Sequence, residues 1–314
     1  MTRRLFYCDH HRVPLPAGHK FPMRKYALLR GILAAEGFFR LEPAPPAARE
    51  TIELAHDPDY VRAFLTGTVE PRVMRRIGFP WSEGLVQRTL ASVGGTLAAA
   101  RDALDVGFGG TLAGGTHHAF RAEGSGFCVF NDIAVAILAL RREGRVTRAA
   151  IVDLDVHQGD GTALMFENDP AVLTLSLHGE KNFPFRKQRS KLDVALPDGT
   201  SDLEYLRVLD EVLPEAFKFR PDILFYQSGV DPLAGDKLGR LALTHEGLME
   251  RDRRVMQRAR DTSIPLTVTL GGGYSDPIES TASAHANTFR TAAEVFGPLP
   301  AIKLSIQGDE HEPR

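Results

Sequence analysis

Two aspartates and a histidine alternate in the segment Asp153-Leu-Asp155-Val-His157, which follows the apolar run 149–152. Alternate side chains of an extended strand point to one face, so we expect these three groups to converge at a strand end. Buried carboxylates and imidazoles are costly unless they are paired or bound to a metal ion. The alternative is an aspartate that caps the following helix and a histidine satisfied in a loop. The spacing favours a metal site.

Two adjacent histidines, His117 and His118, form a second candidate group within the sequence GGTHHA. Glycines precede the pair, and the glycine-containing stretch GSGFCVFND follows it at 124–132. Glycine permits tight turns and close approach of the backbone to a ligand. The pair could also be a chance surface pair, which is our interpretation of His10 and His11. We predict that His117 and His118 belong to a functional site.

The composition is that of an ordinary globular enzyme, with 43% hydrophobic and 25% charged residues among 314. A net charge of -2 gives no electrostatic reason to expect a nucleic acid or an anionic membrane as a partner. No apolar stretch is long enough for a membrane span, and the N-terminus does not resemble a signal peptide. Cys8 and Cys128 are the only cysteines, which suits a reducing compartment. We therefore expect a cytoplasmic protein.

Strand-like apolar runs alternate with helical segments along the chain. We predict strands at 149–154, 172–177, 222–226 and 266–270, and helices at 133–142, 202–217 and 245–260. This alternation favours an α/β fold with a mostly parallel sheet covered on both faces. We expect one catalytic domain over residues 1–300 and a polar C-terminal tail over 301–314.

Polar residues follow four of these strands. Because ligands bind outside the carboxyl ends of parallel strands, these positions predict one shared site. The residues concerned are Asp155 and His157, Ser176 and His178, Asp231, and Tyr274.

The predicted chemistry is metal-assisted hydrolysis. Three protein ligands, Asp155, His157 and Asp231, would leave one position open for water, and a metal ion lowers the pKa of water and polarises a carbonyl. A neutral histidine could move the proton, and Tyr274 could donate to the developing oxyanion. Asp153 and Asp160 could each orient one imidazole. No serine or cysteine has the setting of a nucleophile, and we interpret Cys128 as a packing residue.

The chain resembles the zinc-dependent histone deacetylase family of the arginase–deacetylase superfamily. The matching segments span roughly residues 3–297 and are GGTHHA, GSGFCVFND, VDLDVHQGDGT, LSLH, SGVDPLAGDKLGRLALT and LGGGY. The form HQGDGT and residues 182–189 are most similar to class IV deacetylases and their bacterial relatives. The resemblance implies a three-layer α/β/α fold with an eight-stranded mostly parallel sheet, and an acyl-lysine or a small acylated amine as substrate.

The resemblance also implies a role for each matching residue. Zn²⁺, or alternatively Fe²⁺, would bind Asp155, His157 and Asp231. The implied catalytic residues are His117, His118 as general base, Asp153, Asp160 and Tyr274, while Gly126 and Phe127 would contact the substrate. A K⁺ ion would bind at Asp153, Asp155, His157, Ser176 and Leu177, and a second one at backbone carbonyls near Phe166, Asp169 and Val172.

Two segments depart from the family pattern. The stretch 78–84 lacks the aspartate that grips the substrate backbone in many members. The loop of the second tunnel aromatic reads Phe183-Pro-Phe185, and either phenylalanine could form that wall.

Three other functions stay open. An acidic rim formed by Glu83, Glu123 and Glu180 would favour acetylpolyamines as substrates, although ordinary solvation explains these residues equally well. A two-manganese ureohydrolase is disfavoured because Gln158 and Pro232 stand where further acidic ligands are needed. A non-catalytic sensor of acylated ligands is disfavoured because every catalytic residue type is present. The oligomeric state, the acyl chain length and the native metal are left open by the sequence.

Overall fold

The computed structural model describes residues 2–299, so the predicted tail lies wholly outside the described residues. Its strands form one sheet in the order β2-β1-β3-β8-β7-β4-β5-β6, and every neighbouring pair is parallel. The strands are β1 (Arg4–Tyr7), β2 (Arg40–Pro43), β3 (Phe108–Thr111), β4 (Ala149–Asp153), β5 (Val172–Gly179), β6 (Leu192–Leu196), β7 (Ile223–Gln227) and β8 (Leu266–Thr269).

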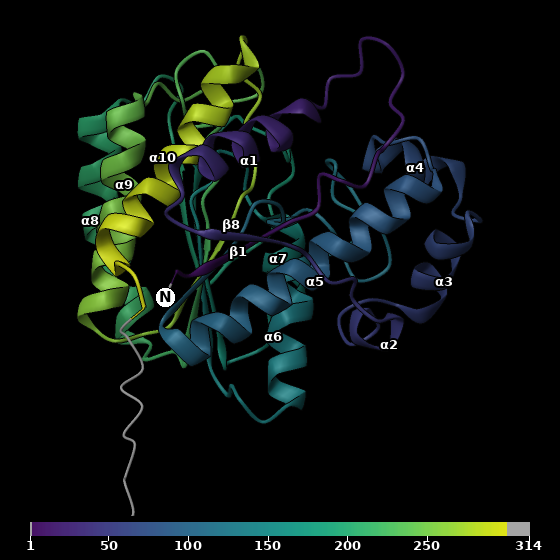
Figure 1. Ribbon diagram of the computed structural model, residues 1–314, viewed down its shortest axis with the longest axis horizontal. Helices are drawn as coiled ribbons and strands as arrows, with labels where there is room; N and C mark the ends of the chain where they lie inside the picture. Colours follow the sequence, from purple (N-terminus) through teal and green to yellow (C-terminus); the bar gives the residue numbers. More distant parts are fainter. Residues whose placement is uncertain (1, 300–314) are drawn as a thin grey trace, which may run out of the picture.

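Helices cover both faces of the sheet, which gives the three-layer α/β/α architecture (Figure 1). Helices α1 (Arg24–Glu36), α8 (Asp202–Lys218), α9 (His245–Asp261) and α10 (Ile278–Phe296) cover one face. Helices α5 (Glu83–Val106) and α6 (Asp132–Arg142) cover the other. The short helices are α2 (Arg49–Ile52), α3 (Pro58–Thr66), α4 (Pro71–Ile77) and α7 (Asp160–Met165).

Successive side chains of the central strands point alternately into two hydrophobic cores. On β4, Ala150 and Val152 pack into the core beneath α8 and α9, whereas Ala149 and Ile151 pack into the core beneath α5 and α6. Both sides are buried, which explains why these strands read as continuous apolar runs. The predicted fold class is therefore confirmed.

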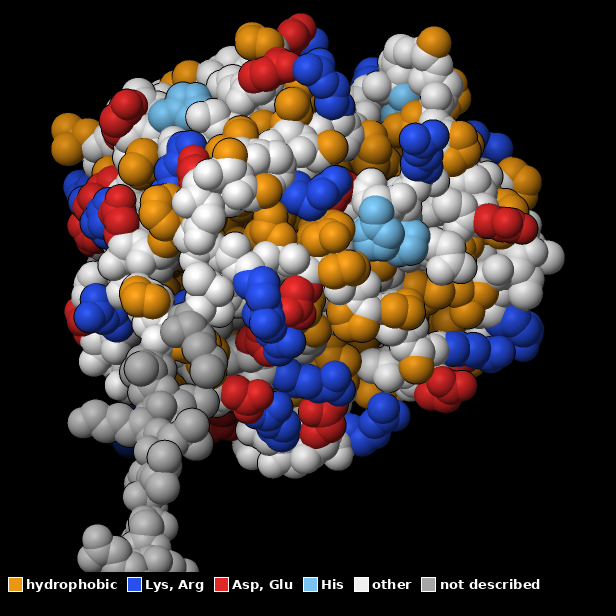
Figure 2. Space-filling view, viewed as in Figure 1, with side chains coloured by type: hydrophobic (Ala, Val, Ile, Leu, Met, Phe, Trp, Pro, Cys, Tyr) orange, Lys and Arg blue, Asp and Glu red, His pale blue; other side chains and the backbone are white. Residues whose placement is uncertain are grey.

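The four strands predicted from the sequence, β4, β5, β7 and β8, are all present and are neighbours at the centre of the sheet. The other four strands were not predicted. No described helix is both long and apolar enough to cross a membrane. Basic and acidic side chains are interspersed over the face shown in Figure 2.

Candidate active site

Asp155, His157 and Asp231 come together at the carboxyl edge of the sheet. Their ligand atoms all lie within 4.8 Å of one another, and all three residues are buried. The Nδ1 atom of His157 is 3.0 Å from Asp155 Oδ1 and 3.1 Å from Asp231 Oδ2. Two carboxylates and one imidazole around one point fit a single divalent ion and leave room for a further ligand.

The alternation predicted that Asp155 and His157 lie on the strand. In the structure they lie in the loop after β4. Strand β4 ends at Asp153, whose Oδ1 accepts a hydrogen bond from the Asp155 backbone N–H at 3.2 Å. Asp155 Oδ1 likewise accepts from the His157 N–H at 3.0 Å. These side-chain hydrogen bonds replace the backbone hydrogen bonds of the sheet and turn the chain after Asp153. Asp155 and His157 nevertheless stay on the same side of the chain.

The three ligand groups are strongly coupled by their charges. Burial lowers the pKa of His157, but hydrogen bonds and charge from Asp155 and Asp231 outweigh burial and raise it to about 10. Burial and the Asp155 charge raise the pKa of Asp231 to about 7. Two buried carboxylates whose oxygens lie within 4.8 Å of each other need a cation between them.

The tandem histidines each bind one aspartate. His117 Nδ1 lies 2.7 Å from Asp153 Oδ2, and His118 Nδ1 lies 2.7 Å from Asp160 Oδ1, the first residue of α7. The position of Asp160 in a glycine-containing turn beyond the strand predicts that it is more solvated than Asp153. This prediction is wrong, because Asp160 and Asp153 are 4% and 3% exposed. Asp160 is the first residue of α7, and its side chain is buried in the interior.

The two imidazoles nevertheless differ in charge. Burial lowers the pKa of His117, but Asp153 and Asp155 outweigh it and raise the pKa to about 9. Burial and the neighbouring His117 charge lower the pKa of His118 to about 4, against the opposing effect of Asp160. The asymmetry comes from a second carboxylate, because His117 Nε2 is also 3.9 Å from Asp155 Oδ1.

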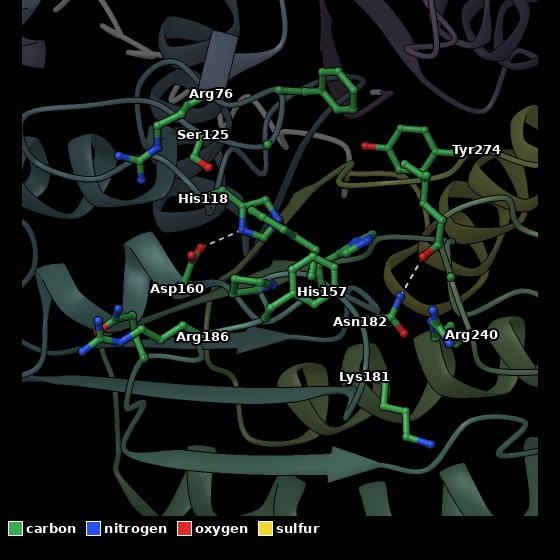
Figure 3. A pocket seen from close by; sticks show the side chains of 18 of the residues that line it. Arg76, His118, Ser125, His157, Asp160, Lys181, Asn182, Arg186, Arg240 and Tyr274 are labelled. Atoms are coloured by element: carbon green, nitrogen blue, oxygen red, sulfur yellow. Dashed lines mark hydrogen bonds and ion pairs between the residues drawn. The ribbon is translucent and has the colours of Figure 1, made fainter. Parts of the chain in front are cut away.

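The glycines of the segment 271–273 let the loop after β8 pack against the metal ligands. Gly272 donates its N–H to Asp155 Oδ2 at 2.7 Å. A Cβ atom at Gly272 would lie 1.9 Å from Asp231 Oδ2, so only glycine fits there. The loop then directs the Tyr274 side chain toward the centre of the cavity (Figure 3). Burial raises the pKa of the Tyr274 phenol well above its ordinary value, so the phenol keeps its proton.

A cavity of about 970 Å³ opens above these groups, with His118, His157 and Tyr274 in its lining. Phe127 and Phe183 also line it, and the Phe183 ring centroid is 4.9 Å from that of His118. Phe185 is 88% exposed and lies further out, so Phe183 forms the inner wall.

Gly126 and Phe127 both adopt positive φ angles, 52° and 65°. Such a conformation is strained for phenylalanine and is imposed by its surroundings, since the Phe127 N–H donates to the Ile77 carbonyl at 2.7 Å. No residue of 78–84 lines the cavity, in agreement with the missing rim aspartate.

Comparison with known proteins decides the family. The histone deacetylase domain model matches residues 19–291. This chain belongs to the histone deacetylase family. Histone deacetylase 2 of Arabidopsis thaliana is 32% identical over 82% of this chain and 70% of its own length. A probable deacetylase of Archaeoglobus fulgidus is 32% identical over 78% and 72% of the two chains.

Two further similarities extend over nearly the whole chain. An uncharacterised protein of Picosynechococcus is 46% identical over 92% of this chain and 98% of its own length. The crystal structure of the HDA15 HD domain has a TM-score of 0.77 at 24% identity, covering 95% of this chain and 90% of that chain. That structure supports the fold. Placement within class IV stays a prediction.

The residues predicted to bind K⁺ are adjacent in the structure. Ser176 on β5 stands opposite Asp153 on β4, next to Leu177, and all three are buried beside Asp155 and His157. Phe166, Asp169 and Val172 are linked by two consecutive turns, because the Asp169 N–H donates to the Phe166 carbonyl and the Val172 N–H to the Asp169 carbonyl.

Three buried residues that hold the loops of the candidate site, Asp132, Lys25 and Gln158, were given no positioning role from the sequence. Asp132 accepts hydrogen bonds from the Gly115 N–H at 2.9 Å and the Thr116 N–H at 2.7 Å, and so fixes the loop before His117. Its place directly after the helix cap Asn131 is a sequence signal for a helix start, but not for this contact.

Lys25 and Gln158 hold the site through hydrogen bonds to residues that are far away in the sequence. Lys25, from α1, donates to the carbonyls of Gly271 and Gly273 at 3.2 and 3.4 Å, beneath the Tyr274 loop. Gln158 donates to the Gln188 carbonyl at 2.8 Å and joins the ligand loop to the loop between β5 and β6. These contacts carry no sequence signal because the partners are distant along the chain.

Replacing Asp132 with alanine is expected to destabilise the protein by on the order of 3 kcal/mol, because several buried donors lose their acceptor. The hydroxyl groups of Thr96 and Thr116 donate to the same carboxylate at 2.5 and 2.6 Å. Denaturant unfolding would measure the loss, with Asp132→Asn as the matched variant that keeps one acceptor oxygen. An unchanged free energy of unfolding in Asp132→Ala would show that the histidine loop is held by other contacts.

Proposed function

We propose that this protein is a metal-dependent amidohydrolase that removes an acetyl or other acyl group from an amine such as acyl-lysine. One observation carries the proposal: the metal-ligand cluster, the Asp-bound histidines and Tyr274 converge beneath one cavity with Phe127 and Phe183 in its walls. An aromatic-walled tunnel suits the aliphatic stem of an acylated lysine, and polar groups at its base suit the amide.

Asp155, His157 and Asp231 would hold Zn²⁺, or alternatively Fe²⁺. A divalent ion there would supply Lewis acidity, which polarises the amide carbonyl and lowers the pKa of water. His118, neutral near pH 7, takes the proton of the attacking water and returns it to the leaving amine. His117 stays protonated and acts electrostatically. The Tyr274 hydroxyl donates to the oxyanion that develops on the carbonyl oxygen.

The remaining groups orient the substrate and the histidines. The Gly126 carbonyl would accept the substrate amide N–H, while Phe127 and Phe183 pack against the stem. Asp153 and Asp160 hold the imidazoles in one tautomer and orientation. We also propose K⁺ at Asp153, Asp155, His157, Ser176 and Leu177, where it would offset the charge of the buried aspartates.

The geometry gives little support to a two-manganese ureohydrolase. Gln158 stands where a further acidic ligand is needed, and its amide group is engaged with Gln188 and Asp193. A silent sensor is also disfavoured, because ligand sensing has no need of two aspartate-bound histidines and a tyrosine close to the metal-ligand cluster.

Turnover of a fluorogenic acyl-lysine peptide tests the proposal. We expect hydrolysis that a chelator abolishes and that added Zn²⁺ or Fe²⁺ restores. Binding without turnover in the metal-loaded protein would favour the sensor. A series of acyl chain lengths on peptide and polyamine carriers would then define the substrate.

Replacing Tyr274 with phenylalanine is expected to lower kcat by about 10²–10³-fold, because one oxyanion donor is lost. Metal content and the free energy of unfolding should stay near their original values, since the Tyr274 hydroxyl forms no hydrogen bond with another described residue. Tyr7→Phe, on β1 and outside the cavity lining, is the control. An unchanged rate in Tyr274→Phe would make this residue a packing group.

A further inference from the structure

The mouth of the catalytic cavity is lined by basic side chains. Those in the cavity lining are Arg76, Lys181, Arg186, Lys237 and Arg240. They come from three separate segments, namely α4, the loop between β5 and β6, and the loop between β7 and α9. In Figure 3 the four labelled members surround His118 and His157 from different sides. This distribution differs from the interspersed charges of Figure 2.

Acidic side chains are nearly missing from the same surface. Among the described residues that line the cavity, Asp160 is the one acid, and it is buried against His118. Glu83, Glu123 and Glu180, which could have formed an acidic rim, do not line the cavity. Glu123 instead pairs with Arg76 at 2.5 Å. The structure therefore gives no support to a rim that attracts polyamines.

The nearby carboxylates neutralise this surface only in part. Lys237 pairs with Asp276 at 2.7 Å, while Arg240 and Lys181 share Asp198 at 3.3 and 3.9 Å. Such exposed pairs are weak and can exchange partners. Together with Glu123, three carboxylates face five cations, so two positive charges remain in excess.

Among the five basic side chains of this surface, Arg186 is the one that forms no hydrogen bond or ion pair with a described residue. It is exposed and lies one residue after Phe185, in the loop that also carries Phe183. Lys187 holds this loop in shape by donating to the carbonyls of Asn182 and Pro184, both at 2.7 Å. Arg186 is therefore presented at the cavity by a braced segment and is available to a substrate anion.

We propose that the substrate is an acidic polypeptide segment, in which aspartates or glutamates flank the acylated lysine. The inference rests on the proposed function and names its substrate class. The acyl group must reach the metal ligands at the base, so the basic mouth faces the carrier and not the acyl group. Several cations spread around the mouth match a chain with carboxylates on both sides of the lysine.

Three peptides with the same acyl-lysine and acidic, neutral or basic flanks test this proposal. We expect kcat/KM for the acidic peptide to exceed that for the basic peptide by about 10- to 100-fold at low ionic strength, chiefly through KM. The difference should shrink in about 0.5 M salt because exposed charges are screened. Equal rates, or a preference for basic flanks, would overturn the proposal.

Charge reversal at one position localises the effect. Arg186→Glu should reduce the acidic-to-basic ratio of kcat/KM by about 5- to 10-fold. Arg189→Glu is the matched control, because Arg189 is exposed in the same loop but does not line the cavity. An equal effect of both variants would mean that net charge, and not this mouth, sets the preference.

Direct binding separates this inference from the proposed function. The fluorescence anisotropy of the same three labelled peptides gives dissociation constants without turnover. Tight binding of the acidic peptide without hydrolysis would refute the enzyme and keep the charge selectivity. Hydrolysis of all three peptides at one rate would keep the enzyme and refute the selectivity. A small anionic acylated amine that competes as well as the acidic peptide would refute the polypeptide carrier.

Discussion

Asp231→Ala is expected to lose the metal ion and to lower kcat by at least about 10³-fold, because the Lewis acid is lost with it. The protein should bind about one divalent ion per chain before the change, through the cluster of Asp155, His157 and Asp231. Elemental analysis of the purified protein measures the loss. Full metal content in the alanine variant would refute the assignment.

Two further variants separate metal binding from folding. Asp231 is fully buried, and its Oδ1 accepts a hydrogen bond from the Val156 N–H at 2.9 Å, so alanine also removes a structural contact. Asp231→Asn can keep that bond while it removes the charge, and it should still bind metal more weakly. Asp236→Asn changes a nearby carboxylate outside the ligand cluster and should retain the ion.

His118→Ala is expected to lower kcat by about 10²–10⁴-fold, because the general base and acid is lost. His117→Ala should cost less, since His117 stays charged and acts only on the field of the site. The pKa of His118 is about 4 and that of His117 about 9, which supports this division at neutral pH. Rates over a range of pH, with equal metal content in both variants, provide the measurement.

The reverse order at every pH would show that the roles are exchanged. Asp160→Asn offers an independent check, because it removes the charge that holds His118 while keeping a hydrogen-bond acceptor. It should lower kcat less than His118→Ala does. Asp153→Asn should act on His117 in the same way.

The sequence predicted the architecture because the four central strands are buried on both faces. Their runs, such as 149–154 and 222–226, are continuously apolar and bounded by turns, which is readable locally. The edge strands β2 and β6 and the inner strands β1 and β3 were missed. Strand β2 is partly exposed, and β3 has the sequence FGGT, whose glycines weaken any strand signal.

The candidate site was also named largely from the sequence, since the residues after parallel strands share one edge. The strand-end rule brought together Asp155, His157, Asp231 and Tyr274, which lie at that edge in the loops that follow β4, β7 and β8. The reason is that each group closely follows a strand in the sequence, and the carboxyl ends of parallel strands meet at one edge of the sheet.

Only the tertiary structure decided what surrounds that site. It buried Asp160 as deeply as Asp153, and it placed Asp155 beside His117, so the two histidines differ through a contact 38 residues away in sequence. It placed the ring of Phe183, and not that of Phe185, at the inner wall of the cavity. It gathered basic residues from helix α4 and two loops at one mouth. Burial and electrostatic coupling depend on neighbours that folding brings from distant segments, and local spacing does not contain them.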